Sequence, residues 1–164
     1  LAPMAKEMGL TMCIENLYEN IGGHIVEGAG CDVRRAVERI DRMNDRYHAE
    51  VLGFCFDTGH ANLVGIDFES FITALGHRLK VLHLHDNDGR SDLHQIPFTF
   101  TRTRENKPST DWQGFVRGLR NIHFDKVLSF ETAPVLTAFP EALKEDTLTL
   151  IAKIGGYFKE EIEQ

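Results

Sequence analysis

Strand-like and helical patterns alternate along the chain. Four short apolar segments are predicted strands: residues 11–16, 51–56, 79–84 and 126–130. Between and after them, apolar residues recur at i, i+3, i+4 and i+7, the spacing of an amphipathic helix. Asp32, Asp67 and Asp111 stand where three of these helices should begin, and aspartate is a preferred N-cap residue. Repeated strand–helix units predict an α/β fold with a parallel sheet.

Three further segments complete the predicted organisation. Residues 1–8 carry apolar side chains at positions 1, 4, 5 and 8, which would form the packed face of an opening helix that ends at Gly9. Residues 22–30 contain four glycines and are interpreted as a loop. Pro140 suits the first turn of a last helix.

Alternate residues within the four predicted strands differ in character. One set is large and apolar, as a face packed against helices should be: Met12, Ile14, Phe54, Phe56, Leu82, Leu84, Leu128 and Phe130. The opposite set begins with small residues and ends with an ionisable group at the carboxyl end of each strand. A barrel needs small residues on its concave face and places its chemistry at the carboxyl ends of its strands. We therefore expect a curved sheet with the candidate site at that end.

The composition fits one soluble domain over residues 1–164. Apolar residues make up 42% and charged residues 26%, and no apolar run approaches the roughly 18 residues that a membrane span needs. The net charge of −7 disfavours nucleic acid and anionic membranes as partners. The three cysteines are widely spaced, which indicates neither a disulfide framework nor a thiolate zinc site. Because no signal segment is visible either, we expect a cytoplasmic protein.

Four ionisable residues share one side and one end of the predicted strands: Glu15, Asp57, His83 and Glu131. In a parallel sheet they should converge on one point. Three carboxylates held that close need a compensating cation to stay ionised. Carboxylate and imidazole ligands together suit manganese, magnesium or zinc. The alternative is that acidic residues at strand ends only cap the segments that follow; it stays open for each residue alone and is disfavoured for all four together.

Six short motifs follow one another along the chain: Ile14-Glu15-Asn16, Asp57-Thr58-Gly59-His60, His83-Leu84-His85-Asp86, Asp92-Leu93-His94, Asp111-Trp112 and Glu131-Thr132. In this order they resemble the motifs of the xylose isomerase-like TIM barrel superfamily. That superfamily contains sugar and sugar-phosphate isomerases and epimerases, inosose dehydratases and metal-dependent abasic-site endonucleases. The resemblance runs from about residue 1 to residue 155. It implies parallel βα units that form the C-terminal half of a (β/α)8 TIM barrel.

The resemblance also implies roles for individual residues. Four of them correspond to the family's shared ligands of a divalent metal ion: Glu15, Asp57, His83 and Glu131. The two glutamates of this set also correspond to the acid and base of the family's epimerases. His60, Asp92 and His94 match positions that either contact substrate or bind further metals in multinuclear members. His85 is left without an assigned role.

Two departures from the family pattern concern the substrate. The simplest mononuclear epimerases carry an arginine six residues after the histidine ligand, where this chain has Gly89. Arg90, the next residue, is therefore the candidate contact for a substrate anion. The chain also has an insertion that contains Arg102, Arg104 and Lys107. This insertion is interpreted as a solvated surface loop; the alternative is a contact for a phosphate or carboxylate of the substrate.

The chain is short for the fold that it resembles. A complete (β/α)8 barrel takes roughly 250 residues, and the motifs belong to its last four strands. A four-stranded half would leave two open sheet edges and an uncovered concave face. We therefore expect a fragment of a longer protein, whose N-terminal half completes the barrel. The alternative is a homo-oligomer in which two copies cover these edges.

Three functions are consistent with these residues. The first is a divalent-metal-dependent isomerase or epimerase that acts on a sugar or sugar phosphate through an enediolate, with Glu15 and Glu131 as the bases. The second is a metal-dependent abasic-site endonuclease or other phosphoester hydrolase, which the negative net charge disfavours. The third is a catalytically incomplete half-barrel that serves as a binding or assembly module.

Overall fold

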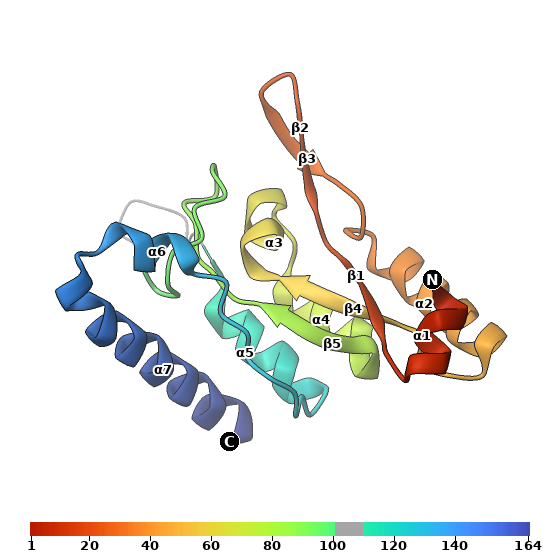
Figure 1. Ribbon diagram of the computed structural model, residues 1–164. Helices are drawn as coiled ribbons and strands as arrows, with labels where there is room; N and C mark the ends of the chain where they lie inside the picture. The colour runs from red at the N-terminus through yellow and green to blue at the C-terminus, as the bar shows by residue number, and fades with distance from the viewer. Residues whose placement is uncertain (101–109) are drawn as a thin grey trace.

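A three-stranded parallel sheet forms the centre of the molecule. The computed structural model describes residues 1–100 and 110–164, so that Arg102, Arg104 and Lys107 lie outside the described residues. The strands lie in the order β1 (Met12–Glu15), β4 (Leu52–Asp57) and β5 (Leu79–His83) (Figure 1). Glu15 lies beside Cys55 in the register, and Asp57 lies beside His83. The predicted parallel sheet is confirmed, and its carboxyl ends bring the motifs together.

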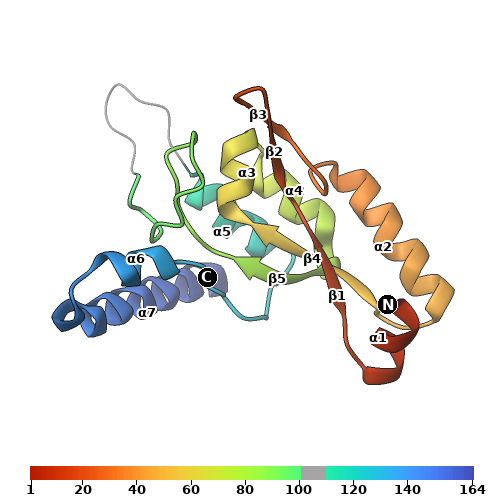
Figure 2. The same ribbon diagram turned by 45° about the horizontal axis from the view of Figure 1, so that its top comes forward.

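Three helices cover one face of this sheet: α2 (Val33–Tyr47), α4 (Phe68–Leu75) and α5 (Trp112–Asn121) (Figure 1 and Figure 2). Each begins at its predicted aspartate, whose carboxylate accepts a hydrogen bond from a backbone N–H of the first turn: Asp32, Asp67 and Asp111. A short 3-10 turn, η1 (Gly76–Arg78), joins α4 to β5. The three helices therefore begin where the sequence predicted.

The predicted apolar face of the strands forms the core. Four of its side chains are fully buried: Phe54, Phe56, Leu82 and Leu84. The other four are partly buried and pack against the same core: Met12, Ile14, Leu128 and Phe130. Phe56 meets Phe68 of α4 edge-on, with 5.3 Å between the ring centroids. Each fully buried Phe or Leu side chain stabilises the fold by about 1.5–3 kcal/mol.

The segment predicted as a glycine-rich loop contains a β-hairpin. Strands β2 (Tyr18–Ile21) and β3 (His24–Glu27) pair antiparallel around Gly22 and Gly23, whose φ angles are 61° and 87°. Two consecutive positive φ angles are typical of a type I′ turn, which glycine adopts without strain. The loop prediction is therefore wrong for residues 24–27. The Gly-Gly pair between two β-prone segments was the signal for a hairpin.

The opening helix forms as predicted but packs differently. Helix α1 (Ala2–Met8) ends at Gly9 in the left-handed conformation, with φ of 63°. Its buried side consists of the small residues Ala2 and Ala5, which lie in one cluster with Val51. The larger side chains predicted for the packed face are instead exposed: Leu1, Met4 and Met8. An apolar surface on this helix is left facing outward.

The fourth predicted strand takes its expected place without forming a regular strand. A single parallel bridge joins Leu84 to Phe130. In it, the N–H of Leu84 donates to Ser129 O at 2.8 Å, and the N–H of Glu131 donates to Leu84 O at 3.1 Å. Within the described residues, this bridge to Leu84, the residue after β5, is the sole strand pairing of the segment. The strand prediction for 126–130 is wrong in extent and right in position and direction.

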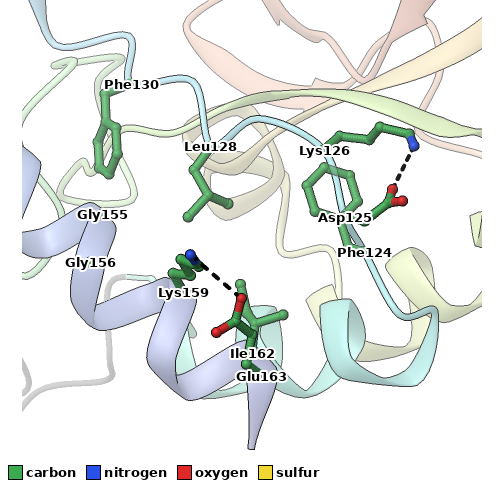
Figure 3. Close-up of a pocket in the computed structure, with 10 residues that line it drawn as sticks. All are labelled: Phe124, Asp125, Lys126, Leu128, Phe130, Gly155, Gly156, Lys159, Ile162 and Glu163. Carbon is green, nitrogen blue, oxygen red and sulfur yellow. Dashed lines mark hydrogen bonds and ion pairs between the residues drawn. The ribbon is translucent and has the colours of Figure 1, made fainter.

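Two helices close the chain. Helix α6 (Ala133–Ala138) precedes the long helix α7 (Glu141–Glu163), and Pro140 is the residue before the first turn of α7. Helix α7 and the segment 124–130 line a cavity of about 350 Å³ (Figure 3). Its apolar lining comes from both sides: Phe124, Leu128, Phe130, Gly155, Gly156 and Ile162. None of the helices among the described residues combines the length and hydropathy of a membrane span.

Candidate metal centre

The four predicted metal ligands converge at the carboxyl ends of the strands. The Nδ1 atom of His83 lies 3.5 Å from Glu15 Oε1, 3.8 Å from Asp57 Oδ2 and 3.5 Å from Glu131 Oε2. We call these four residues the carboxylate group. Each comes from a different strand or strand-like segment, so the parallel order of the sheet is what assembles them.

The donor atoms of the carboxylate group fit a divalent cation. Ligand atoms that are each about 2.1 Å from one ion lie about 3.0–3.5 Å from one another, and the contacts to His83 Nδ1 span 3.5–3.8 Å. This nitrogen is buried and has no hydrogen-bond partner within the described residues. A buried donor atom facing three carboxylates is the arrangement that a cation satisfies. Asp57, His83 and Glu131 thus offer donor atoms within 4.8 Å of one another, and Glu15 does so with His83 and Cys55, so the metal site expected from the sequence stays a prediction that this arrangement supports.

The members of the carboxylate group differ in exposure. The side chain of Asp57 is completely buried, whereas those of Glu15 and Glu131 are 25% and 46% exposed. A small molecule that enters from solvent would meet the two glutamates first. Asp57 lies beneath them as an anchor.

Asp57 is held in place by Asn16, the residue after β1, and by the first turn of α3. Its Oδ1 accepts the backbone N–H of His60 at 2.7 Å and so caps helix α3 (Thr58–Val64). The side-chain amide of Asn16 pairs with the Asp57 backbone in both directions, at 2.8 and 2.9 Å. Asp57 thus both caps helix α3 and belongs to the candidate site. His60 lies in the first turn of α3.

A second group of ionisable side chains adjoins the first. Asp92 Oδ2 lies 3.4 Å from His60 Nε2 and 3.3 Å from His94 Nε2, and Asp92 Oδ1 lies 3.8 Å from His85 Nδ1. We call these four residues the histidine group. It contains the three residues predicted for substrate or further metals, and it adds His85, which the sequence left unassigned.

Each imidazole of the histidine group has its other ring nitrogen occupied. His60 Nδ1 lies 3.1 Å from the carbonyl oxygen of Asn16, His94 Nδ1 lies 3.0 Å from that of Glu131, and His85 Nε2 lies 3.0 Å from Asp57 Oδ1. Histidines that bind metals typically donate their second N–H to such acceptors. The other ring nitrogen of each imidazole faces Asp92. The donor chemistry of this group suits a borderline ion such as zinc.

Charge and burial shift two pKa values in this group. Burial by itself disfavours the imidazolium of His60, but hydrogen bonds to Asp92 and Glu15 and the charge of Asp57 outweigh it and raise the pKa to about 10. Burial also opposes ionisation of Asp92, yet the hydrogen bond to His60 and the charge of His94 lower its pKa. A positive charge between the carboxylates is therefore favoured.

Two residues near the site were missed by the sequence reasoning. Cys55 is buried on the concave face, with its sulfur within 4.8 Å of donor atoms of Glu15 and His83. Burial, together with the charges of Glu15 and Asp57, raises the pKa of this thiol. Tyr18 lies on the hairpin, and its ring centroid is 5.2 Å from that of His60. For Cys55, the alternation of the strand predicts the face of the sheet but no role at the site. The position of Tyr18 beside His60 could not be predicted without the hairpin.

Arg90 is not brought into either group. Its side chain is exposed, and its backbone N–H donates to Asp88 Oδ1 at 2.9 Å. The contact of Arg90 with a substrate anion stays a prediction.

A family model described as "Xylose isomerase-like TIM barrel" matches residues 1–152, which is most of the chain. The chain belongs to this family. A crystal structure of a D-tagatose 3-epimerase-like protein superposes with a TM-score of 0.59 at 22% identity, over 95% of this chain and 52% of that protein. This likeness shows the fold. The predicted partial (β/α)8 barrel is confirmed.

Two curated proteins resemble the chain in sequence. The uncharacterized protein y4fM of Sinorhizobium fredii is 27% identical over 70% of this chain and 37% of its own length. The uncharacterized protein MJ1311 of Methanocaldococcus jannaschii is 26% identical over 100% of this chain and 51% of its own length. A structure of D-psicose 3-epimerase in the presence of D-fructose has a TM-score of 0.45 at 17% identity, over 76% of this chain and 36% of that protein. The chain spans between about a third and a half of the length of these proteins.

Proposed function

We propose that this chain carries the metal site of a divalent-metal-dependent isomerase or epimerase that acts on a sugar or sugar phosphate. The convergence of Glu15, Asp57 and Glu131 on the unpartnered Nδ1 of His83 is the observation that carries the proposal. Membership of the xylose isomerase-like family and the epimerase title of one structural relative support it. The cation is manganese, magnesium or zinc.

The two glutamates are the proposed acid and base. Both side chains reach solvent, whereas Asp57 does not, so Glu15 and Glu131 are the carboxylates that a sugar can contact. One would take a proton from a carbon next to the carbonyl, and the other would return a proton to the sugar, as the enediolate route requires. When bound, the divalent ion supplies stabilisation of negative charge on neighbouring substrate oxygens. His60, at the rim between both groups, would orient a hydroxyl of the sugar.

Metal analysis combined with sugar assays tests this proposal. The intact encoded protein is freed of metal with a chelator, reloaded with Mn²⁺, Mg²⁺ or Zn²⁺, and assayed on a panel of ketoses, aldoses and their phosphates. We expect epimerisation or isomerisation that requires metal and is lost in Glu131→Gln. Hydrogen exchange between the sugar and solvent, followed by NMR, should accompany turnover. A metal-loaded protein that exchanges no sugar proton contradicts the proposal.

The histidine group favours a second candidate, a phosphoester hydrolase. Its three imidazoles and the Asp92 carboxylate could hold a further ion next to the carboxylate group, and paired ions about 3.5–4 Å apart are typical of phosphoester hydrolysis. Cleavage of abasic-site DNA by the same metal-loaded protein, without sugar turnover, would replace the first candidate by this one. Wild-type Mn²⁺ affinity in a protein in which all four members of the carboxylate group are substituted would exclude that group as the metal site on which the first candidate rests.

The first half of a barrel is the proposed partner of this chain. Strand β1 is at one edge of the sheet, and segment 126–130, with Val127 74% exposed, is at the other. The apolar cavity beside α7 opens next to this second edge (Figure 3). Hydrogen exchange on the intact encoded protein should show protected amides in both edge segments. Fast exchange there would favour the alternative of an assembly module with open edges, and a concentration-dependent mass would favour association of two copies.

A further inference from the structure

His85 is the most deeply enclosed ionisable side chain at the site, together with Asp57, and the proposed reaction gives it no task. Both side chains are 0% exposed. The imidazole lies between the two groups: Nε2 faces both carboxylate oxygens of Asp57, at 3.0 and 3.2 Å, and Nδ1 faces Asp92. It is therefore the physical link between the carboxylate group and the histidine group.

The neighbouring residues build a fixed position for this imidazole. The hydroxyl of Thr58 accepts the backbone N–H of His85 at 3.0 Å and donates to its carbonyl oxygen at 2.8 Å. The ring of His94 stacks on that of His85, with 4.0 Å between centroids and 9° between planes. A Cβ at Gly59 would lie 1.9 Å from His85 Cε1, so only glycine leaves room for the ring. Thr58 and Gly59, from the motif that begins at Asp57, thus fix the position of His85, which belongs to the motif that begins at His83.

The contacts of His85 define which ring nitrogen carries the proton. The ionised carboxylate of Asp57 can only accept, so Nε2 is the donor in this pair. Nδ1 has no hydrogen-bond partner within the described residues, nor has the Asp92 Oδ1 atom that it faces. The ring is therefore held by Asp57 on one side, and its other nitrogen faces Asp92 without a hydrogen bond.

We propose that His85 is a positioning residue that fixes the Asp57 carboxylate in the orientation that binds the metal ion. This inference rests on the proposed metal site and adds a residue to it. A donor to a ligating carboxylate orients the ligand before the ion arrives, and losing such a donor typically weakens metal binding 10–100-fold. Asp57 has one oxygen engaged as the cap of α3, so rotation of its carboxylate is already restricted, and His85 fixes the remaining freedom.

Mn²⁺ titration of the intact, metal-free encoded protein tests this role. His85→Leu fills a similar volume without the N–H, and His85→Gln replaces the N–H by an amide donor. His77→Leu is the matched control, because His77 is exposed on η1, which precedes β5 and so lies at the opposite end of that strand from the site, and it belongs to neither group. We expect His85→Leu to weaken Mn²⁺ binding 10–100-fold, His85→Gln to recover most of it, and His77→Leu to bind as the wild type does.

A second readout does not depend on the metal. The ¹⁵N chemical shifts of the metal-free wild type should show His85 protonated at Nε2. Protonation at Nδ1 alone overturns the proposal, as does a folded His85→Leu protein with wild-type Mn²⁺ affinity, or a His85→Gln protein as weak as His85→Leu. If the wild type binds Mn²⁺ and depends on His85 but turns over no sugar, the proposed function fails and the role of His85 stands.

Discussion

The two groups at the carboxyl end of the sheet have opposite compositions. In the carboxylate group, three carboxylates surround the imidazole of His83; in the histidine group, three imidazoles surround the carboxylate of Asp92. The first is assembled by strand ends, and the second by residues of α3 and of the loop after β5. The ligand types favour a harder ion in the first and a softer ion in the second. One site thus offers two chemically distinct cation environments, joined by the contact of His85 with Asp57.

The largest effect is expected from Asp57, which belongs to one group and contacts the other. Asp57→Asn preserves the shape and the N-cap of α3 but removes the buried charge that faces both His83 and His85. We expect metal affinity to fall more than about 100-fold, beyond the usual loss for a residue that only orients a ligand. Calorimetric titration with Mn²⁺ measures this. Binding within tenfold of wild type would show that the two groups do not depend on their shared carboxylate.

The glutamates should affect turnover more than metal affinity. Glu131→Gln retains an oxygen ligand and removes a base, so we expect the rate of sugar turnover to fall by about 10²–10⁴-fold. The Mn²⁺ affinity should fall less than in Asp57→Asn, because the Glu131 side chain is the most exposed of the group. Steady-state kinetics at saturating Mn²⁺ separates the two quantities. An equal loss of affinity in both variants would mean that Glu131 acts as a ligand alone.

The histidine group should discriminate between ions. Asp92→Asn removes the charge on which His60, His85 and His94 converge and leaves the carboxylate group intact. We expect Zn²⁺ affinity to fall about 10–100-fold while Mn²⁺ affinity stays at the wild-type level. Titrations of each variant with Mn²⁺ and with Zn²⁺ measure the two affinities. Glu131→Gln, which changes the carboxylate group instead, is the variant for comparison. Equal losses for both ions would show a single site rather than two environments.

The sequence predicted the carboxylate group better than the histidine group for a physical reason. Residues of a strand alternate between two faces, and parallel strands bring their carboxyl ends to one edge, so the side and end of Glu15 or His83 follow from position alone. No such rule directs a side chain in a loop. The proximity of Asp92 to His94 could be suggested by resemblance, while the position of His85 between them required the structure. Hairpin residue Tyr18 was missed because the glycines at 22 and 23 were interpreted as a loop.

The limits of the fold prediction have a similar origin. Helix starts followed from Asp32, Asp67 and Asp111, because capping is decided by neighbouring residues. The packing of α1 and the length of strand 126–130 depend on what lies beside them. Apolar side chains at residues 1, 4 and 8 of the chain were predicted to be packed and are exposed, and segment 126–130 pairs through one bridge. Local signals define where elements begin, whereas burial depends on the partner surface.

The smallest effect is expected from an ion pair outside the site, between Arg78 and Asp41 of helix α2. Its effect on the free energy of unfolding gives a reference for the effects measured in the two groups. Arg78 contacts both oxygens of Asp41, at 2.5 and 2.8 Å, and its hydrogen bond lowers the pKa of that carboxyl group. Because this pKa is lower in the folded than in the unfolded protein, the pair stabilises the fold at pH values above the ordinary pKa of a carboxyl group. This contribution is lost as the pH falls through the folded-state pKa. Since Asp41 is partly exposed, Asp41→Asn should cost about 0.5–1 kcal/mol at pH 7.

Urea unfolding of the metal-free protein at pH 7 and at stepwise lower pH measures this difference. The gap between wild type and Asp41→Asn should shrink as the wild-type carboxyl group becomes protonated, and it should not respond to Mn²⁺ or Zn²⁺. Asp57→Asn should show the converse, because metal binding stabilises the wild type by mass action and the variant much less. If the difference in unfolding free energy between wild type and Asp41→Asn stays constant with pH, packing rather than charge holds this pair. In that case the packing contribution must also be subtracted from the stability changes measured at the site before they are assigned to electrostatics.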